Sequence, residues 1–556
     1  MINTPSRIFL LLATVVIFVL ATCDVRIFAQ TPQPTATPDP TPTHADIMRG
    51  EYGRYRANND LLSYALDIRV DPEKKTISGK NTIRFRMLNS DARIQIDLYE
   101  NLNVDKIIFG SNSLKYTRDA GAVFIDFPET LKTGRTYSID FYYSGTPKTV
   151  RLLGGLLFRT DPAGRPWIAS TCEIGGASMW WPNKDQWRDE VENMTISVAV
   201  PNAFMDVSNG KFIGKKDLGD GYTRWDWAVS YPINSYGVSV NVGRYEHWSE
   251  RFGDLPLDFY VLPEDIVDAK KQFSQVKGML EAYQHYFGEY PFKKDGYKLV
   301  QTPYVGMEHQ SAVTYGNHFV NGFDKQDWLG VGIAAKFDYI IIHESGHEWF
   351  GNSVTADDIS DGWIHEGWTT YLECLYVEYT FGHDDYLKYT NAYKKLVINK
   401  EPVVAQRGIS KPLSIDMYAK GALFLNTLRS VINDDKKWFS LIRNFYQHFK
   451  YHNILTEDIV EYFNKQTGMN LTPIFRQYLW HAAIPKLELK FQSEGNVAYR
   501  WQTDEPNFAM PVKVGTKDNW KIIQPTTEWK IMKTDIKMAD FGAATDLYYI
   551  DVVSSQ

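Results

Sequence analysis

The sequence has few cysteines and no block of basic residues. Three cysteines occur among 556 residues, Cys23, Cys172 and Cys374, and their spacing fits no disulfide framework. We therefore expect Cys172 and Cys374 to be free and buried. The net charge is −7, and without a cluster of lysines and arginines the sequence predicts that nucleic acid is not a partner.

An apolar run long enough to span a membrane is also missing at the start of the chain. Ile8 to Leu20 is an uncharged run of 13 residues behind Arg7, which matches the hydrophobic region of a signal peptide and is short for a membrane span. We predict a signal peptide over residues 1–29. Two processing routes stay open: ordinary cleavage after Ala29, or a lipobox ending at Cys23, whose lipidation would anchor the protein to a membrane. Both routes predict an extracytoplasmic protein, either periplasmic, secreted or lipid-anchored at the cell surface.

The rest of the chain changes its pattern three times. Residues 30–45 are rich in Thr and Pro and predict a stiff linker. Residues 46–246 alternate apolar and polar side chains, which predicts an antiparallel β domain. The alternation is clearest at Tyr64, Leu66, Ile68 and Val70. Residues 247–484 have mainly helical spacing and residues 485–556 return to a period of two, so we expect a multidomain α+β protein ending in a small β domain.

The stretch from His343 to Glu366 carries the pattern of a zinc site. His343 and His347 are one helical turn apart, so their imidazoles leave the same face of a helix. An H-E-x-x-H sequence on a helix supplies two zinc ligands and, in Glu344, a general base. Zinc in a hydrolase needs a third protein ligand, and Glu366 lies in a second predicted helix, 19 positions after His347. The metzincin pattern is excluded because Ser353 stands where that pattern has a third histidine.

Three further acidic residues are candidates for the same site. Glu308 lies in a glycine-marked extended run, 305–317, and a strand edge beside zinc can bind a peptide backbone. Glu173 lies among small and apolar residues, where a carboxylate needs a partner or water; a solvated loop acid explains it equally well. Glu373, two turns after Glu366, either orients a zinc histidine or is a solvated acid on a helix.

Together these motifs resemble the zinc aminopeptidase family of aminopeptidase N, the puromycin-sensitive enzyme and leukotriene hydrolase, which are gluzincin peptidases. That family has a glycine-marked M-E-N strand, then H-E-x-x-H, then a zinc glutamate after eighteen residues, then a Y-x-K-G-A segment. The counterparts here are Gly306-Met307-Glu308-His309, His343 to His347, Glu366, and Tyr418 to Ala422. Order and spacing agree over about residues 60–485.

The resemblance implies a saddle-like N-terminal β domain, a thermolysin-like catalytic domain, a C-terminal β-sandwich and one zinc ion per chain. It implies an enzyme that hydrolyses N-terminal residues from peptides. The zinc ligands would be His343, His347 and Glu366. Glu344 would be the general base that activates the zinc-bound water, and Tyr418 would stabilise the oxyanion.

The family also implies how the substrate is held. Glu308 and Glu173 would bind its free α-ammonium, beside Gly306 and Met307. Without the family, Tyr418 would be interpreted as an ordinary helix tyrosine.

This sequence departs from the family at four places, one of which is the segment around Pro182, where the family's common cysteine and Asp-Glu-Pro run are absent. His309 and His365 replace asparagines, and the helical C-terminal domain of many relatives is not expected, which would leave the site more open. Two other functions stay as alternatives: a thermolysin-type zinc endopeptidase, or a non-catalytic peptide-binding protein on the same scaffold. No feature indicates an oligomer.

Overall fold

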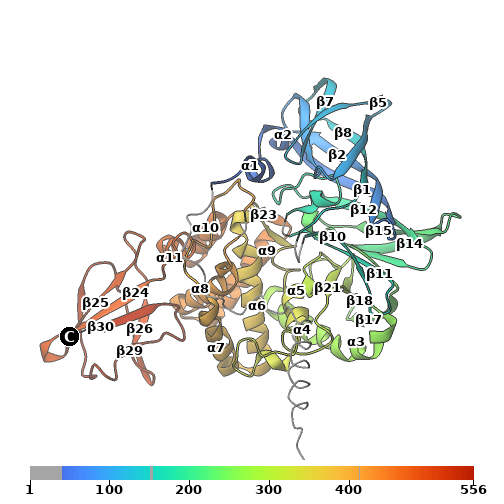
Figure 1. The fold of residues 1–556 in the computed structure, drawn as a ribbon. Helices are drawn as coiled ribbons and strands as arrows, with labels where there is room; N and C mark the ends of the chain where they lie inside the picture. Colours follow the sequence, from blue (N-terminus) through green and yellow to red (C-terminus); the bar gives the residue numbers. More distant parts are fainter. Residues whose placement is uncertain (1–40, 151–153, 174, 412, 556) are drawn as a thin grey trace, which may run out of the picture. The chain divides into compact units, whose positions relative to one another are not determined.

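The computed structural model describes residues 41–150, 154–173, 175–411 and 413–555. The predicted signal peptide, Cys23 and most of the predicted linker lie outside these residues. Contacts group His44–Gln556 into one unit, which begins with α1 (His44–Gly50) and α2 (Arg54–Ala57) (Figure 1). No helix in the described ranges has the length and hydropathy needed to cross a membrane.

The predicted alternation of the N-terminal region produces strands whose apolar side chains are buried on one face. Its largest sheet has eight strands in the order β14-β15-β12-β1-β2-β8-β4-β5. These strands are β1 (Asn59–Asp71), β2 (Thr76–Met87), β4 (Leu102–Phe109), β5 (Asn112–Ser113), β8 (Thr136–Gly145), β12 (Asn193–Pro201), β14 (Lys211–Asp217) and β15 (Tyr222–Val229). The β-rich character of this region is therefore as predicted.

One pair of strands differs from the predicted antiparallel arrangement. β1 and β12 are parallel, with Ser63 beside Asn193 and Arg69 beside Ala199. A parallel pair needs a long connection between its strands, and here more than a hundred residues separate them. The period of two could not reveal this, because it is the same in parallel and antiparallel strands.

Two smaller sheets contain strands from the segment between β1 and β12 and from the segment after β12. A three-stranded sheet has the order β3-β7-β6 and a five-stranded sheet the order β13-β16-β11-β10-β9. Their strands are β3 (Asp91–Asp97), β6 (Lys115–Asp119), β7 (Ala122–Leu131), β9 (Thr149–Val150), β10 (Gly154–Thr160), β11 (Pro166–Thr171), β13 (Met205–Ser208) and β16 (Val240–Gly243). Glu173 lies two residues after the end of β11.

The next sheet places the extended run around Glu308 at an edge. Its order is β17-β18-β19-β21-β20, so β20 has a strand on one side only. The strands are β17 (Glu246–Phe252), β18 (Leu255–Val261), β19 (Tyr297–Gln301), β20 (Gly306–Met307) and β21 (Val313–Tyr315). After this sheet begins, the chain forms two consecutive helices, α3 (Ile266–Gln272) and α4 (Gln275–Phe287). Between them the Ser274 hydroxyl donates to the Lys271 carbonyl at 2.7 Å, a bond that competes with helix continuation.

Helices form the part of the chain that carries the metal motif. They are α5 (Tyr339–Gly346), α6 (Trp363–Phe381), α7 (His383–Ala392), α8 (Asp416–Ile432), α9 (Asp435–Phe449), α10 (Thr456–Thr467) and α11 (Thr472–Leu479). Thr456 is the first residue of α10 and does not occupy its cap position. The cap position is Leu455, whose backbone N–H donates to Asp458 at 2.8 Å. The Thr456 hydroxyl instead donates to Asp361 and accepts from the Trp363 indole at 2.7 Å, a tertiary role that local sequence does not encode.

Two glycines let α6 and α8 approach closely, side by side in Figure 1. A Cβ added to Gly421 would lie 2.7 Å from the Gly367 Cα, and one added to Gly367 would lie 3.1 Å from the Gly421 Cα. Gly367 follows Glu366 directly and Gly421 is one turn after Tyr418. The crossing therefore brings these two candidate site residues together.

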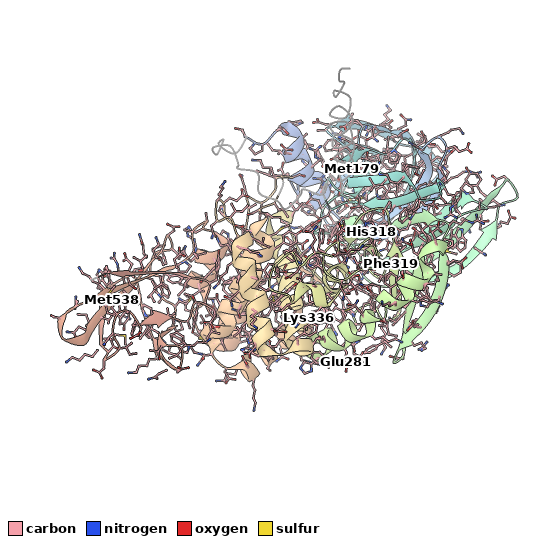
Figure 2. All side chains as sticks on the ribbon, turned by 60° about the horizontal axis from the view of Figure 1, so that its bottom comes forward. Met179, Glu281, His318, Phe319, Lys336 and Met538 are labelled. Carbon is pink, nitrogen blue, oxygen red and sulfur yellow. The ribbon has the colours of Figure 1, made fainter. Side chains whose placement is uncertain are left out.

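The C-terminal segment consists of two small sheets. The first has the order β28-β25-β24-β30 and the second the order β27-β26-β29. Their strands are β24 (Lys486–Phe491), β25 (Asn496–Gln502), β26 (Val512–Thr516), β27 (Asn519–Ile523), β28 (Lys530–Lys533), β29 (Gly542–Ala543) and β30 (Asp551–Ser555). Figure 2 shows Met538 in this segment and Met179 in the N-terminal β region. Cys172 and Cys374 are free and buried, as predicted.

Candidate metal centre

The helix that carries both histidines begins at a strongly bonded cap. Asp338 accepts hydrogen bonds from the backbone N–H groups of Ile340 (3.1 Å) and Ile341 (3.4 Å), which satisfies orphan donors of the first turn. The same carboxylate accepts from the Tyr315 hydroxyl and the Gln272 amide, both at 2.7 Å. Because the following residues of α5 are buried, the helix is held rigidly where it presents its histidines.

Three buried ligand atoms converge at one point. His343 Nε2 and His347 Nε2 are 3.2 Å apart, and Glu366 Oε2 is 3.3 Å from each of them. A tetrahedral zinc ion with ligand bonds of about 2.0–2.1 Å separates its ligands by about 3.3 Å. The triangle therefore has the dimensions that zinc requires.

The hydrogen bonds of the two rings direct lone pairs to that point. His343 Nδ1 lies 2.5 Å from Glu373 Oε1, and His347 Nδ1 lies 3.0 Å from the Phe350 carbonyl. With the protons on Nδ1, both Nε2 atoms carry lone pairs, and Glu366 Oε2 has no hydrogen-bond partner. Three buried acceptors at contact distance repel one another unless a cation lies between them, so the donor set fits a zinc ion.

Glu344 lies beside this point and against the edge strand. It forms a second cluster with Glu308 and His347, whose ligand atoms are all within 4.8 Å of one another. A Cβ on Gly306 would lie 2.8 Å from Glu344 Oε1. A side chain at position 306 would therefore displace the Glu344 carboxylate from its position. Burial raises the pKa of Glu344 to about 8, against the opposing effect of His343.

Glu308 and Glu173 follow strands of two different sheets and lie at the same site. Together with Glu366 they form a third cluster within 4.8 Å. Glu308 is buried and its Oε1 has no hydrogen-bond partner. Burial and neighbouring carboxylates, Glu308 first, raise the pKa of Glu173 well above its usual range. Glu173 itself is half-buried at this place. Met307, beside Glu308 on β20, is buried.

Two tyrosine rings flank the ring of His343. Tyr339, one turn earlier on α5, stacks with a centroid distance of 5.3 Å and an interplanar angle of 20°. Tyr418 from α8 stacks at 6.1 Å and 25°. Burial, followed by the charge of Glu366, raises the pKa of Tyr418 well above its usual range, so its phenol keeps its proton at neutral pH.

Glu373 is held by more groups than the sequence suggested. Besides His343, it accepts hydrogen bonds from the hydroxyls of Tyr389 (3.0 Å) and Tyr393 (2.5 Å). These tyrosines and the stacked Tyr339 were not among the predicted site residues. The one signal in the sequence was their spacing of four, which places Tyr389 and Tyr393 on one helical face, and Tyr339 and His343 on another.

The two histidines that depart from the family pattern lie away from the ligand triangle. His309 is fully buried, with Nδ1 3.5 Å from the Thr314 hydroxyl. His365 stacks on Trp187, and its Nε2 accepts from the Ala356 N–H at 2.9 Å. Burial lowers the pKa of both to about 3. In the part of the chain that the structure describes, the clusters of metal-binding side chains all belong to the one site around Glu366.

Comparison with known families finds matches for both the N-terminal β region and the region that carries the candidate metal centre. Residues 61–236 match the Peptidase M1 N-terminal domain, and residues 272–478 match the Peptidase family M1 domain. Leucine aminopeptidase 2 of Phaeosphaeria nodorum is 24% identical over 445 residues, 73% of this chain and 68% of that protein. Endoplasmic reticulum aminopeptidase 1 of Homo sapiens is 24% identical over 347 residues, 60% of this chain. The match spans only 36% of the length of the human protein.

Solved structures share the fold. The M1 zinc metallopeptidase of Deinococcus radiodurans aligns with a TM-score of 0.64 at 20% identity, over 77% of this chain and 95% of its own. A mutant of that enzyme bound to a Tyr-Ser-Ala substrate aligns with the same TM-score, at 21% identity.

Proposed function

Because this chain belongs to peptidase family M1, we propose that it is a zinc aminopeptidase that removes N-terminal residues from peptides. One observation carries the exopeptidase part of the proposal. Glu308 and Glu173 place two carboxylates within 4.8 Å of each other and of Glu366, and Glu308 Oε1 lacks a hydrogen-bond partner. A substrate ammonium would supply the missing positive charge.

His343, His347 and Glu366 would hold one zinc ion per chain. When bound, zinc polarises the scissile carbonyl and lowers the pKa of the attacking water toward ~7. Glu373 holds the proton of His343 on Nδ1, which keeps Nε2 free to bind the metal. The rings of Tyr339 and Tyr418 restrict the tilt of the same imidazole.

Glu344 would act as the general base. Its carboxylate takes a proton from the attacking water and later gives that proton to the nitrogen of the leaving amine. A carboxylate whose pKa is raised to about 8 is a stronger base than an ordinary glutamate and takes up the proton of the water more readily. Gly306 leaves room for this group next to the edge strand.

Tyr418 would donate its phenolic proton in a hydrogen bond to the oxygen of the tetrahedral species. Such a donor acts on charge that develops only in the transition state, and losing one typically costs ~10²–10³ in rate. The close crossing of α6 and α8 sets its distance from Glu366.

Glu308 and Glu173 would fix the register of the substrate. A blocked N-terminus would leave the buried Glu308 and the half-buried Glu173 without a cation, which is costly for a buried charge. β20, at the free edge of its sheet, would pair with the first residues of the peptide, beside Gly306 and Met307.

The test is hydrolysis of aminoacyl-arylamides compared with an N-acetylated peptide. We expect the wild type to cleave free-amine substrates, a chelator to abolish cleavage, and Glu344→Gln to lose activity while keeping zinc. Glu308→Ala should lose free-amine substrates selectively. Internal cleavage of the acetylated peptide would instead support the thermolysin-type endopeptidase, and tight peptide binding without cleavage the binding protein.

The export of the chain and its finer architecture are parts of the same proposal. We propose a mature protein outside the cytoplasm, because residues 1–29 have the composition of a signal peptide. Mass spectrometry of the mature N-terminus distinguishes cleavage after Ala29 from a lipidated Cys23. The resemblance further supports a saddle for residues 46–246, a thermolysin-like domain for 247–484, and a sandwich for 485–556.

A further inference from the structure

His365 is buried next to a metal ligand but its ring faces the other way. It lies on the first turn of α6, one residue before Glu366, and is 1% exposed. Adjacent helix residues point about 100° apart, so the His365 ring leaves the metal side. It stacks flat on Trp187, with a centroid distance of 4.4 Å and an interplanar angle of 10°.

Both ring nitrogens of His365 are engaged. Nε2 accepts a hydrogen bond from the backbone N–H of Ala356 at 2.9 Å. Ala356 is the last residue of the short strand β22 (Val354–Ala356). Nδ1 therefore carries the proton and faces the Tyr236 hydroxyl at 3.3 Å. One side of the ring is thus tied to the catalytic region and the other to the N-terminal β region.

Trp187 is itself fixed from both regions. Its carbonyl accepts from the Asn234 amide at 3.0 Å and from the Asn453 amide at 2.6 Å. Asn453 lies in β23 (His452–Ile454), which pairs in parallel with β22. The surface on which His365 rests is therefore a fixed part of the fold.

We propose that His365 is a positioning residue that sets the rotation of the first turn of α6 and thereby the place of Glu366. The inference rests on the proposed zinc function. Side chains on a helix reach ~5–6 Å from its axis, so a rotation of ~10° displaces a carboxylate by ~1 Å, several times the ~0.2 Å within which zinc–ligand distances are held. The Trp187 stack and the Ala356 hydrogen bond both oppose that rotation.

The consequence is that the N-terminal β region contributes to metal affinity. Trp187 belongs to the same region as Glu173, which lies within 4.8 Å of Glu366. The same packed residues would then position both the zinc ligand Glu366 and the site for the substrate ammonium. A change in the Trp187 surface would alter the positions of both.

The experiment measures the zinc dissociation constant by competition with a chelator, together with the unfolding midpoint of each metal-free protein. The variants are His365→Leu, His365→Asn, Trp187→Leu and Trp187→Phe. The matched control is His247→Leu, because His247 stacks on Tyr260 at the same centroid distance of 4.4 Å and an angle of 12°, yet belongs to no metal cluster.

We expect His365→Leu and Trp187→Leu to weaken zinc binding about 10–100-fold, the range seen when partners of metal ligands are removed. Trp187→Phe keeps a ring to stack on and should remain within about threefold of wild type, and His247→Leu within about twofold. His365→Asn should lie between these limits, and it gives a result even where His365→Leu does not fold.

A role in stability alone gives a different pattern. It would lower the unfolding midpoints and leave the zinc affinity of the folded variants unchanged, and that result overturns the inference. If the zinc affinities follow the expected order but the wild type cleaves no peptide, the proposed peptidase activity fails and the positioning role stands. If the wild type does not bind zinc, both fail.

Discussion

At the residue scale, Glu373 shows how one buried carboxylate can orient a histidine that is proposed to bind zinc. It accepts from His343 Nδ1 and from two tyrosine hydroxyls, so its charge is compensated by three donors. We expect Glu373→Gln to weaken zinc binding about 10–100-fold, because a neutral amide holds the His343 proton less firmly and turns its own N–H groups toward tyrosine donors.

Chelator competition measures this effect. The control is Glu378→Gln on the same helix, since Glu378 pairs with Arg429 and His383 away from the metal. An unchanged zinc constant for Glu373→Gln would show that Glu373 only fills space.

What the sequence predicted at this scale follows from spacing within one helix. His343 and His347 are one turn apart and Glu344 is next to the first of them, so the common face of the two histidines and the nearby carboxylate could be inferred from helix geometry. Glu173 could not be placed in that way, because it is 193 residues from Glu366 and reaches it only through the packing of a different sheet. The tyrosines at Glu373 were missed for the same reason: their partner lies on another helix.

At the element scale, the crossing of α6 and α8 depends on the absence of two side chains. A Cβ at Gly421 would lie 2.7 Å from the Gly367 Cα, so Gly421→Ala must push the helices apart. We expect a stability loss of ~1–3 kcal/mol from overpacking and a fall in kcat larger than any rise in KM, because Tyr418 moves with α8.

Gly278→Ala is the matched control for that substitution. Gly278 is also helical, in α4, but a Cβ there meets nothing within 4 Å. Replacing it should stabilise the protein by ~0.4–1 kcal/mol and leave kcat unchanged. Denaturant unfolding and steady-state kinetics on the two variants measure both effects. A kcat for Gly421→Ala equal to that of the wild type would show that the helix crossing does not position Tyr418.

The elements also show where periodicity is informative and where it is not. The two-residue period identified the N-terminal strands, but the parallel neighbours β1 and β12 have the same period as an antiparallel pair. Threonine is a common helix cap. The Thr456 hydroxyl, however, forms its hydrogen bonds with Asp361 and Trp363, in the segment that carries the proposed metal ligands. In both cases a distant partner decided what local sequence left open.

At the scale of the whole molecule, Glu190 lies where the N-terminal β region meets the catalytic region. Its carboxylate accepts from the Asn453 amide at 3.4 Å. Burial raises its pKa from 4.5 to about 7, against the opposing hydrogen bonds of Thr355, Asn234 and Asn453. Between pH 4.5 and 7 the folded protein therefore holds a proton that the unfolded chain has released.

The sign of the pH dependence follows from that proton. A raised carboxyl pKa costs stability as the pH rises through the window from 4.5 to 7, with a slope of at most ~1.4 kcal/mol per pH unit. We expect Glu190→Gln to remove this contribution, so that the stability difference between variant and wild type grows in favour of the variant from pH 5 to pH 8. Urea unfolding at several pH values measures it, and Glu192→Gln, at an exposed acid two positions later, should show no such trend.

The edge strand β20 is only two residues long, Gly306–Met307, and pairs with β21 on one side. In the proposed function its free side would bind a peptide backbone over a correspondingly short distance, so the affinity for a substrate should stop growing with length after the first few residues. An enzyme built in this way releases its shortened product and must recapture it before each new cut. A long peptide would then be converted into a series of successively shorter peptides that are free in solution. The proportions of these peptides would depend on how quickly each new N-terminal residue is cleaved.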